Sequence, residues 1–300
     1  MAEKKEPTRK QHYIPQEHLR GFSQDALTIY EYNFKKGEAI TAPVPIESVC
    51  RETDLYEMYD EDGSIINVNY LEDVLCQFEG KFAAYKRQLL KKVNKANYRT
   101  KCFLTKEEKQ FWTFYTALQA LRLPSVLQGT ADVLQQVFSE HLTNVEAANT
   151  ALSYCLPFFK EPEEEDINSL VAFLPILKTK WLTVCVAEND HLFTSDTALY
   201  SFSPPTMAFD FEALWFPISS SVTLLFSNPE TSELPINNRL LPLPEEAVDE
   251  LNKGMACIAK NMVFSKYPFT KRDHEIIADA RIIAAERAEK RNIIKMLGEK

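Results

Sequence analysis

The sequence predicts an α+β fold, namely a predominantly helical single domain with a small mixed or antiparallel sheet built from N- and C-terminal strands. Strand-like apolar patterns occur before residue 60 and again after residue 180. Between them lies a long block in which apolar residues recur at helical spacing. No linker rich in proline, glycine or serine divides the chain, so strands from both ends are expected to share one sheet.

The distribution of charged and apolar residues predicts that the chain divides into three segments. Residues 1–10 are expected to form a disordered arm, residues 11–268 one globular domain, and residues 269–300 a charged helix. Residues 235–243 are expected to be a loop. Strands are predicted at 27–32, 55–59, 181–187, 191–194, 214–217, 222–226 and 262–265.

The clearest helix is predicted over residues 69–93. Six apolar residues at three- and four-residue steps form its stripe: Leu71, Leu75, Phe78, Phe82, Tyr85 and Leu89. Thr105 opens a second helix through a capping box with Glu108, and this helix stops before Pro124. Further helices are predicted at 130–142, 144–156, 167–178 and 245–260, with an acidic loop or helix start at 161–166. One face of the last helix is expected to carry Ile276, Ala280, Ile283 and Arg287.

Composition excludes several classes of protein. With 7 glycines in 300 residues, neither dinucleotide-binding nor phosphate-loop glycine motifs are present. A net charge of −9 argues against nonspecific, charge-driven binding to nucleic acid or anionic lipid. Without a secretory leader or an 18-residue apolar run, a cytoplasmic protein outside the membrane is expected. The six cysteines form no CxxC pair, so free thiols and no zinc site are expected.

Arg122 stands out because packing alone would favour an apolar residue there. On a helical wheel it lies within roughly 20° of the centre of the apolar stripe that contains Phe111 and Leu118. A buried guanidinium needs a carboxylate partner or a bound anion. The alternative is that the helix has already ended and the side chain reaches water.

Two carboxylates are placed to meet Arg122 if the two helices pack together. Glu72 and Glu79 lie one heptad apart, at the boundary of the stripe on the first long helix. A carboxylate pair can exchange protons or bind a hard cation such as Mg²⁺. Ordinary solvated surface residues are the alternative.

Other polar candidates lie at the end of a late strand and in the N-terminal segment. Ser195 and Asp196 follow an apolar strand, where they form either a plain turn or the rim of a pocket. No GxSxG surrounds Ser195, so a nucleophile elbow is not supported. His12 has Arg20 nearby and could be held neutral as a general base, although a lone histidine is commonly structural.

These segments together resemble the domain of unknown function 4238 (DUF4238) family. The resemblance covers about residues 10–265 and rests on HYIPQEHLRGF at 12–22, on the glutamate pair, on an Arg-x-Pro at a helix end, on FTSD at 193–196 and on FPIS at 216–219. Two departures concern the site: Glu17-His18 replace the usual aromatic residue, and no proline follows Asp196. The resemblance implies which residues matter and leaves their chemistry open.

Three hypotheses follow for these residues. In the first, the chain is a hydrolase of phosphate-containing anions, nuclease- or phosphodiesterase-like, with His12, Glu72 and Asp196 catalytic. The residues expected to bind substrate are Arg20, Glu79, Arg122 and Ser195, and Mg²⁺ would be the cofactor if one is needed. In the second, the same pocket binds or senses an anionic small molecule. In the third, the charges only pair with each other.

Overall fold

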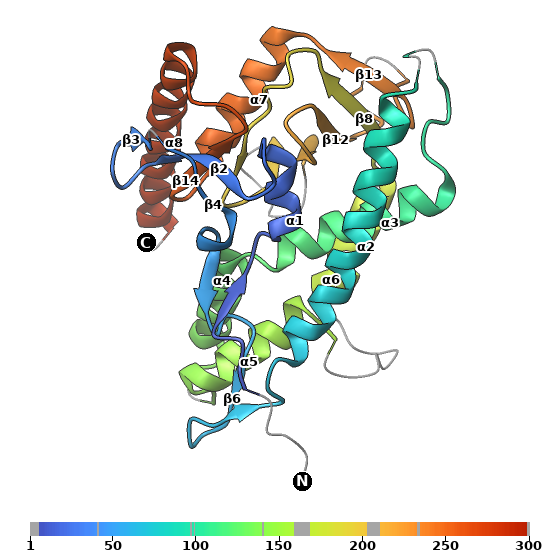
Figure 1. Cartoon of the computed structure of the whole chain (residues 1–300). Coiled ribbons are helices and arrows are strands. Elements are labelled where there is room, and N and C mark those ends of the chain that lie inside the picture. The colour runs from blue at the N-terminus through green and yellow to red at the C-terminus, as the bar shows by residue number, and fades with distance from the viewer. Residues whose placement is uncertain are drawn as a thin grey trace.

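The computed structural model describes residues 6–40, 42–96, 98, 100–139, 141–158, 169–202, 211–232 and 235–298. The α+β class is confirmed, with helices and sheets in one chain (Figure 1). The predicted acidic segment 161–166 and residues 1–5 of the arm lie outside the described residues. Within the described part of the chain, no helix combines the length and apolar character needed to span a membrane.

One five-stranded sheet comes entirely from the second half of the chain. Its order is β10 (Tyr200–Phe202), β11 (Ala213–Pro217), β12 (Val222–Ser227), β8 (Trp181–Ala187) and β13 (Leu240–Leu243). All neighbours are antiparallel except β13, which runs parallel to β8. The prediction of a loop at 235–243 was therefore wrong for β13. Prolines around that short strand hide its pattern, and only pairing with β8 defines it.

The other larger sheet joins the two ends of the chain, as predicted. It consists of β3 (Glu38–Ala39), β2 (Thr28–Asn33), β14 (Met262–Ser265) and β9 (Thr194–Ser195), with β4 (Val44–Pro45) paired to β2. The sequence indicated one sheet, whereas the described strands form two larger sheets and two smaller two-stranded ones. Helix α7 (Glu245–Ile258) contacts β9, β10 and β14 and so bridges both sheets (Figure 1).

The central helices begin and end largely where local signals place them. They are α2 (Tyr70–Val93), α3 (Lys106–Leu121), α4 (Pro124–Val137), α5 (Asn144–Cys155) and α6 (Ser169–Thr179). The capping box is confirmed, since the backbone N–H of Glu108 donates to Thr105 Oγ1 at 3.1 Å and the N–H of Thr105 donates to Glu108 Oε2 at 2.6 Å. Helix α4 begins at Pro124 and not at residue 130, because proline is favoured in a first helical turn.

The N-terminal segment packs tightly onto the rest of the chain. β1 (Lys10–His12) pairs with β5 (Arg51–Thr53), and α1 (Gln16–Leu19) and a 3-10 turn at Arg20–Phe22 follow it. Residues 6–10 are not a free arm: the N–H of Thr8 donates to Asn69, and Arg9 pairs with Asp54 at 2.9 Å. A 3-10 turn at Ile46–Ser48 precedes β5, and a hairpin of β6 (Met58–Tyr59) and β7 (Ile65–Ile66) follows it.

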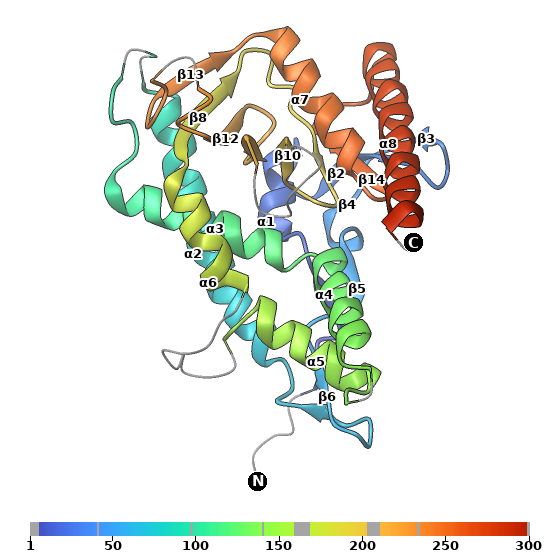
Figure 2. The same ribbon diagram turned by 180° about the vertical axis from the view of Figure 1, so that it is seen from behind.

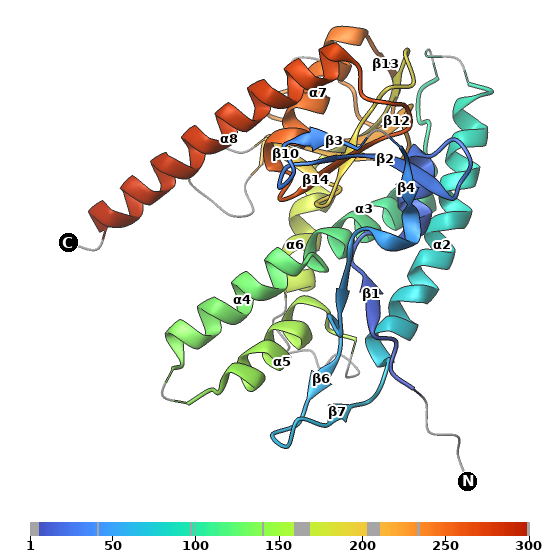
Figure 3. The same ribbon diagram turned by 60° about the vertical axis from the view of Figure 1, so that its left-hand side comes forward.

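Helix α8 (Lys271–Gly298) lies beside α7, and its C-terminal half projects away from the sheets (Figures 2 and 3). Over residues 271–289, where burial is described, Asp273, Ile277 and Ala280 are buried, and Arg287 is exposed. Of the four residues expected on one face, Ala280 is buried and Ile276 and Ile283 are half-buried, so the side packed against α7 only partly matches that face. Asp273 also anchors α8 by pairing with His191 at 2.9 Å.

Gly21 should tolerate no side chain, because a Cβ there would lie 2.4 Å from the carbonyl oxygen of Ile218. We expect Gly21→Ala to lower the free energy of unfolding by about 2 kcal/mol in urea denaturation. Gly80→Ala is the control: nothing lies within 4 Å of that Cβ, so removing a helical glycine should stabilise by about 1 kcal/mol. Equal effects of the two substitutions would contradict the close approach at Gly21.

Candidate functional site

Arg122 follows the last residue of α3 and is 1% exposed. Its Nε donates to the Tyr56 hydroxyl at 3.1 Å, Nη1 to Glu79 Oε1 at 2.8 Å, and Nη2 to the carbonyl oxygen of His12 at 2.7 Å. A guanidinium is always charged, and here three acceptors from three separate segments compensate its burial. Arg122 thus connects α3 with α2, β1 and the segment after β5.

Tyr56 holds Arg122 at both its side chain and its backbone. Its hydroxyl accepts from the guanidinium and donates to the carbonyl oxygen of Arg122 at 3.2 Å. The guanidinium carbon also lies 5.5 Å from the centre of the Tyr56 ring. Pro124 starts the next helix two residues on, so Arg122 lies in the short turn between α3 and α4.

The two glutamates of α2 occupy different environments. Glu79 is paired with Arg122, and 25% of its side chain is exposed. Glu72 forms no such pair: its Oε2 is buried and has no hydrogen-bond partner among the described residues. Burial raises the pKa of Glu72 to about 7, Arg122 opposes this rise, and the neighbouring carboxylates of Glu79 and Glu57 add to it. One helix therefore carries an engaged carboxylate and one that changes protonation near neutral pH.

His12 lies beside the same ion pair. Its backbone carbonyl accepts from Arg122, while its ring Nε2 is buried without a partner in the described structure. Burial lowers the pKa of His12; a hydrogen bond with the Glu47 backbone and the charge of Glu79 oppose this, and Arg51 and Arg122 reinforce it. His12 is therefore neutral at pH 7.

Three of the proposed site residues bond partners other than Arg122, Glu79, Glu72 and His12. Asp196 accepts from the backbone N–H groups of Lys260 (2.8 Å) and Asn261 (2.6 Å) and thereby holds the turn before β14. The hydroxyl of Ser195 lies 2.8 Å from that of Thr197 and 3.1 Å from the sulfur of Met255. Arg20 is exposed, and among the described residues its side chain bonds Glu17 and Gln16, its neighbours in the helix.

Several residues close to the Arg122–Glu79 pair were not singled out by sequence patterns. They are Arg51, Tyr56, Glu57 and Tyr115. Glu57 is 4% exposed and accepts from Gln11 Nε2 at 2.8 Å, and a glutamate inside an apolar strand pattern was the one available signal. The hydroxyl of Tyr115 is buried beside Arg122 and Glu79 and has no partner among the described residues.

We define the acid–base centre as the Arg122–Glu79 pair with His12, Glu72 and Tyr115 around it. Three of its buried polar atoms, Glu72 Oε2, His12 Nε2 and Tyr115 Oη, lack partners in the described structure. A neighbouring cavity of about 440 Å³ is lined by Leu55, Glu57 and Pro124, which flank this centre in the chain. Among the described residues, no group of three or more His, Cys, Asp and Glu is arranged to hold a metal ion.

Replacing Arg122 tests how far the fold depends on it. Arg122→Met leaves three acceptors without their donor: a backbone carbonyl, a tyrosine hydroxyl and a carboxylate. The free energy of unfolding should therefore fall by about 3 kcal/mol. Arg272→Met is the matched control, because that arginine pairs with Glu245 and Asp249 at the surface with 55% of its side chain exposed. Its loss should cost less than about 1 kcal/mol. Similar losses in urea denaturation would refute the special role of Arg122.

The titration of Glu72 predicts a pH dependence of stability. Its pKa is about 7 in the folded chain and 4.5 ordinarily, so the folded state binds this proton more tightly. The contribution of this proton to the free energy of unfolding is complete below pH 4.5 and is lost as the pH rises through 7. Between pH 4.5 and 8, the free energy of unfolding of the wild type should fall by about 1–2 kcal/mol relative to that of Glu72→Gln, after allowance for partial solvent screening. A constant difference in urea denaturation between pH 4.5 and 8 would contradict the shift.

Comparison with known proteins matches one family model, described as protein of unknown function (DUF4238), to residues 10–268. No curated protein and no solved structure matches the chain. The matched region contains β1, α2, the end of α3 and the whole acid–base centre. Because the match covers most of its 300 residues, this chain belongs to the DUF4238 family.

Proposed function

We propose that the chain is a hydrolase of a phosphate-containing anion, and that its acid–base centre performs the proton transfers. The observation that carries the proposal is the set of three buried, unpartnered polar atoms around the Arg122–Glu79 pair. Unsatisfied buried polar groups are rare in folded proteins and are expected where a reacting group or solvent is held. A nuclease or phosphodiesterase in the cytoplasm is the concrete form of this proposal.

Different environments assign different roles to the titratable groups. His12 is neutral and has a free ring nitrogen, so it accepts the proton of the attacking water. Glu72, with its pKa near 7, is protonated in part of the population and gives its proton to the leaving oxygen. Hydrolysis then breaks one phosphorus–oxygen bond and forms another, and one proton is taken up as one is released.

The arginine that meets the substrate is Arg51 in this proposal, and not Arg122 or Arg20. Arg122 already donates to three protein acceptors, so it positions the centre. Arg51 lies opposite His12 in the β1–β5 pair, is partly buried and forms no ion pair with any described residue. Its guanidinium can bind a phosphate oxygen with two parallel hydrogen bonds.

A second candidate is a purely structural role for the centre, without turnover. It is favoured by the full burial of Arg122 and by the fact that neither Arg122 nor Glu72 lines a described cavity. In that case the charges hold α2, α3 and β1 together and the unpartnered atoms bind only water.

Turnover of bis(p-nitrophenyl) phosphate and p-nitrophenyl phosphate, with and without Mg²⁺, separates the two candidates. We expect Glu72→Gln and His12→Ala to lower kcat by about a hundredfold or more, and Arg51→Ala to raise KM. Arg20→Ala is the control, because that exposed side chain bonds only its helical neighbours. No turnover by the wild type, or unchanged turnover in both site variants, would leave the structural candidate.

A further inference from the structure

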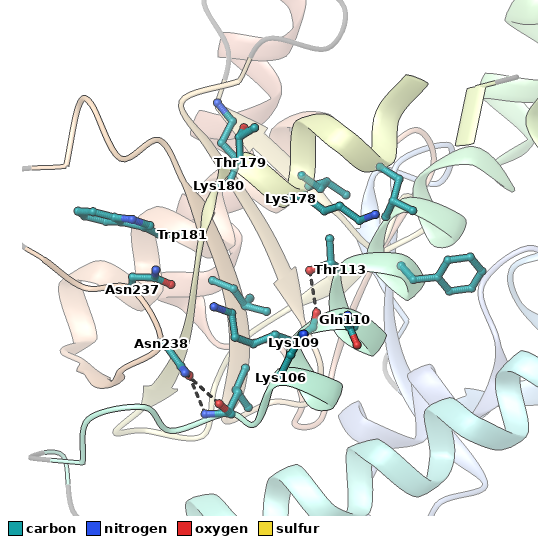
Figure 4. A pocket seen from close by; sticks show the side chains of 15 residues that line it. Lys106, Lys109, Gln110, Thr113, Lys178, Thr179, Lys180, Trp181, Asn237 and Asn238 are labelled. Carbon is teal, nitrogen blue, oxygen red and sulfur yellow. Dashed lines mark hydrogen bonds between the residues drawn. The ribbon is translucent and has the colours of Figure 1, made fainter. Parts of the chain in front are cut away.

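A second cavity, lined by none of the residues of the acid–base centre, has the chemistry of an anion site. It measures about 930 Å³ and lies between the start of α3, the end of α6, the start of β8 and the 237–238 segment. Figure 4 shows Lys106 and Lys109 on α3 at one side, with Lys178 and Lys180 across from them. Lys109 precedes Arg122 by almost four helical turns, or roughly 20 Å.

The charge around this cavity has one sign. Its lining contains four lysines, and no carboxylate among the residues that the structure describes. This is notable in a chain with a net charge of −9. The four lysines form no ion pair with a described residue; Lys180 lies over the ring of Phe211 at 5.1 Å. Like charges gathered around one cavity repel one another, and an anion between them relieves that repulsion.

Helix α3 sorts its charges between two faces. Lys106, Lys109 and Thr113 face the cavity, following each other at three- and four-residue steps. The acidic residues of the same turn face α2 instead: Glu107 accepts from the Tyr85 hydroxyl at 2.8 Å, and Glu108 pairs with Lys92 at 2.8 Å. The carboxylates nearest in sequence are therefore already engaged elsewhere and leave the cavity positive.

The floor of the cavity is apolar and held in place. Leu104, Leu174, Leu177 and Leu182 line it, next to Trp181. Asn238 fixes one edge, because its side-chain amide donates to the carbonyl oxygen of Leu104 at 2.9 Å and accepts from the N–H of Leu104 at 2.6 Å (Figure 4). Gln110 and Asn237 add amide groups at the rim. A ligand that fits must bring apolar or planar surface as well as negative charge.

From these features we infer that this cavity binds a small organic polyphosphate, with a nucleoside di- or triphosphate as the best match. The lysines meet the phosphates as point charges, and the leucine floor with Trp181 meets the base and sugar. A cavity of 930 Å³ lies within the usual range for small-molecule sites, about 300–1,000 Å³. The site is separate from the acid–base centre and does not depend on its activity.

Calorimetric titration with ADP and ATP tests the inference. The wild type should bind both, more weakly at roughly 0.3 M salt than at low salt. The double variant Lys109→Glu/Lys178→Glu should lose affinity by about tenfold or more. The control Lys35→Glu/Lys91→Glu makes the same charge change at two exposed lysines outside the cavity. Its affinity for ADP and ATP should fall by less than about threefold. Glu72→Gln should bind like the wild type, which separates this site from the hydrolase proposal.

Three results would overturn the inference: no binding of ADP or ATP at millimolar concentration, equal losses in the cavity and control variants, or binding only of a single-stranded oligonucleotide. The last result would point to a nucleic-acid surface in place of a small-molecule site. If the double glutamate variant fails to fold, as judged by its unfolding midpoint, Lys109→Gln/Lys178→Gln replaces it. We expect the affinity of this neutral variant for ADP and ATP to fall by about threefold or more.

Discussion

The fold depends on how the charge of Arg122 is compensated inside the protein. A guanidinium cannot shed its proton, so burial to 1% exposure requires acceptors that other parts of the chain supply. Glu79 from α2, the carbonyl oxygen of His12 from β1 and the hydroxyl of Tyr56 meet this need. Each acceptor comes from a different segment, so the same three bonds fix the relative positions of β1, α2 and α3.

That compensation also creates the environment of the remaining polar groups. Burial raises the pKa of Glu72 to about 7, and Arg122, which pairs with Glu79 and not with Glu72, opposes this rise only in part. His12 gives its carbonyl oxygen to Arg122 while its ring stays neutral. At the other end of α3, the engagement of Glu107 and Glu108 by α2 leaves the lysines of the second cavity without acidic neighbours. At the acid–base centre and at the second cavity alike, an ion pair or hydrogen bond engages the nearest carboxylates and so influences the charge of the neighbouring site.

Local signals were enough to predict much of the secondary structure. The α2 stripe was recognisable from its spacing, and Leu71, Leu75, Phe82 and Leu89 are buried as expected. The capping box at Thr105 was readable because it involves residues three apart. Strand β13, the start of α4 at Pro124 and the buried face of α8 were missed. Strand β13 and the buried face of α8 are defined by contact with distant elements, β8 and α7. The start of α4 follows from a local signal that the prediction overlooked, the proline in its first turn.

For the candidate site, the sequence by itself determined that Arg122 falls on the apolar stripe of its helix and that α2 carries a pair of glutamates one heptad apart; it left open whether these charged side chains are buried or reach water. A helical repeat is a local property, so a charged residue on the apolar stripe is visible without any structure. Only the tertiary structure decided that Glu79, and not Glu72, pairs with Arg122, and that Tyr56 and Arg51 lie next to the centre. It also decided that Asp196, Ser195 and Arg20 bond other partners. Those choices depend on helix crossing and strand register between segments far apart in the chain, which no local pattern encodes.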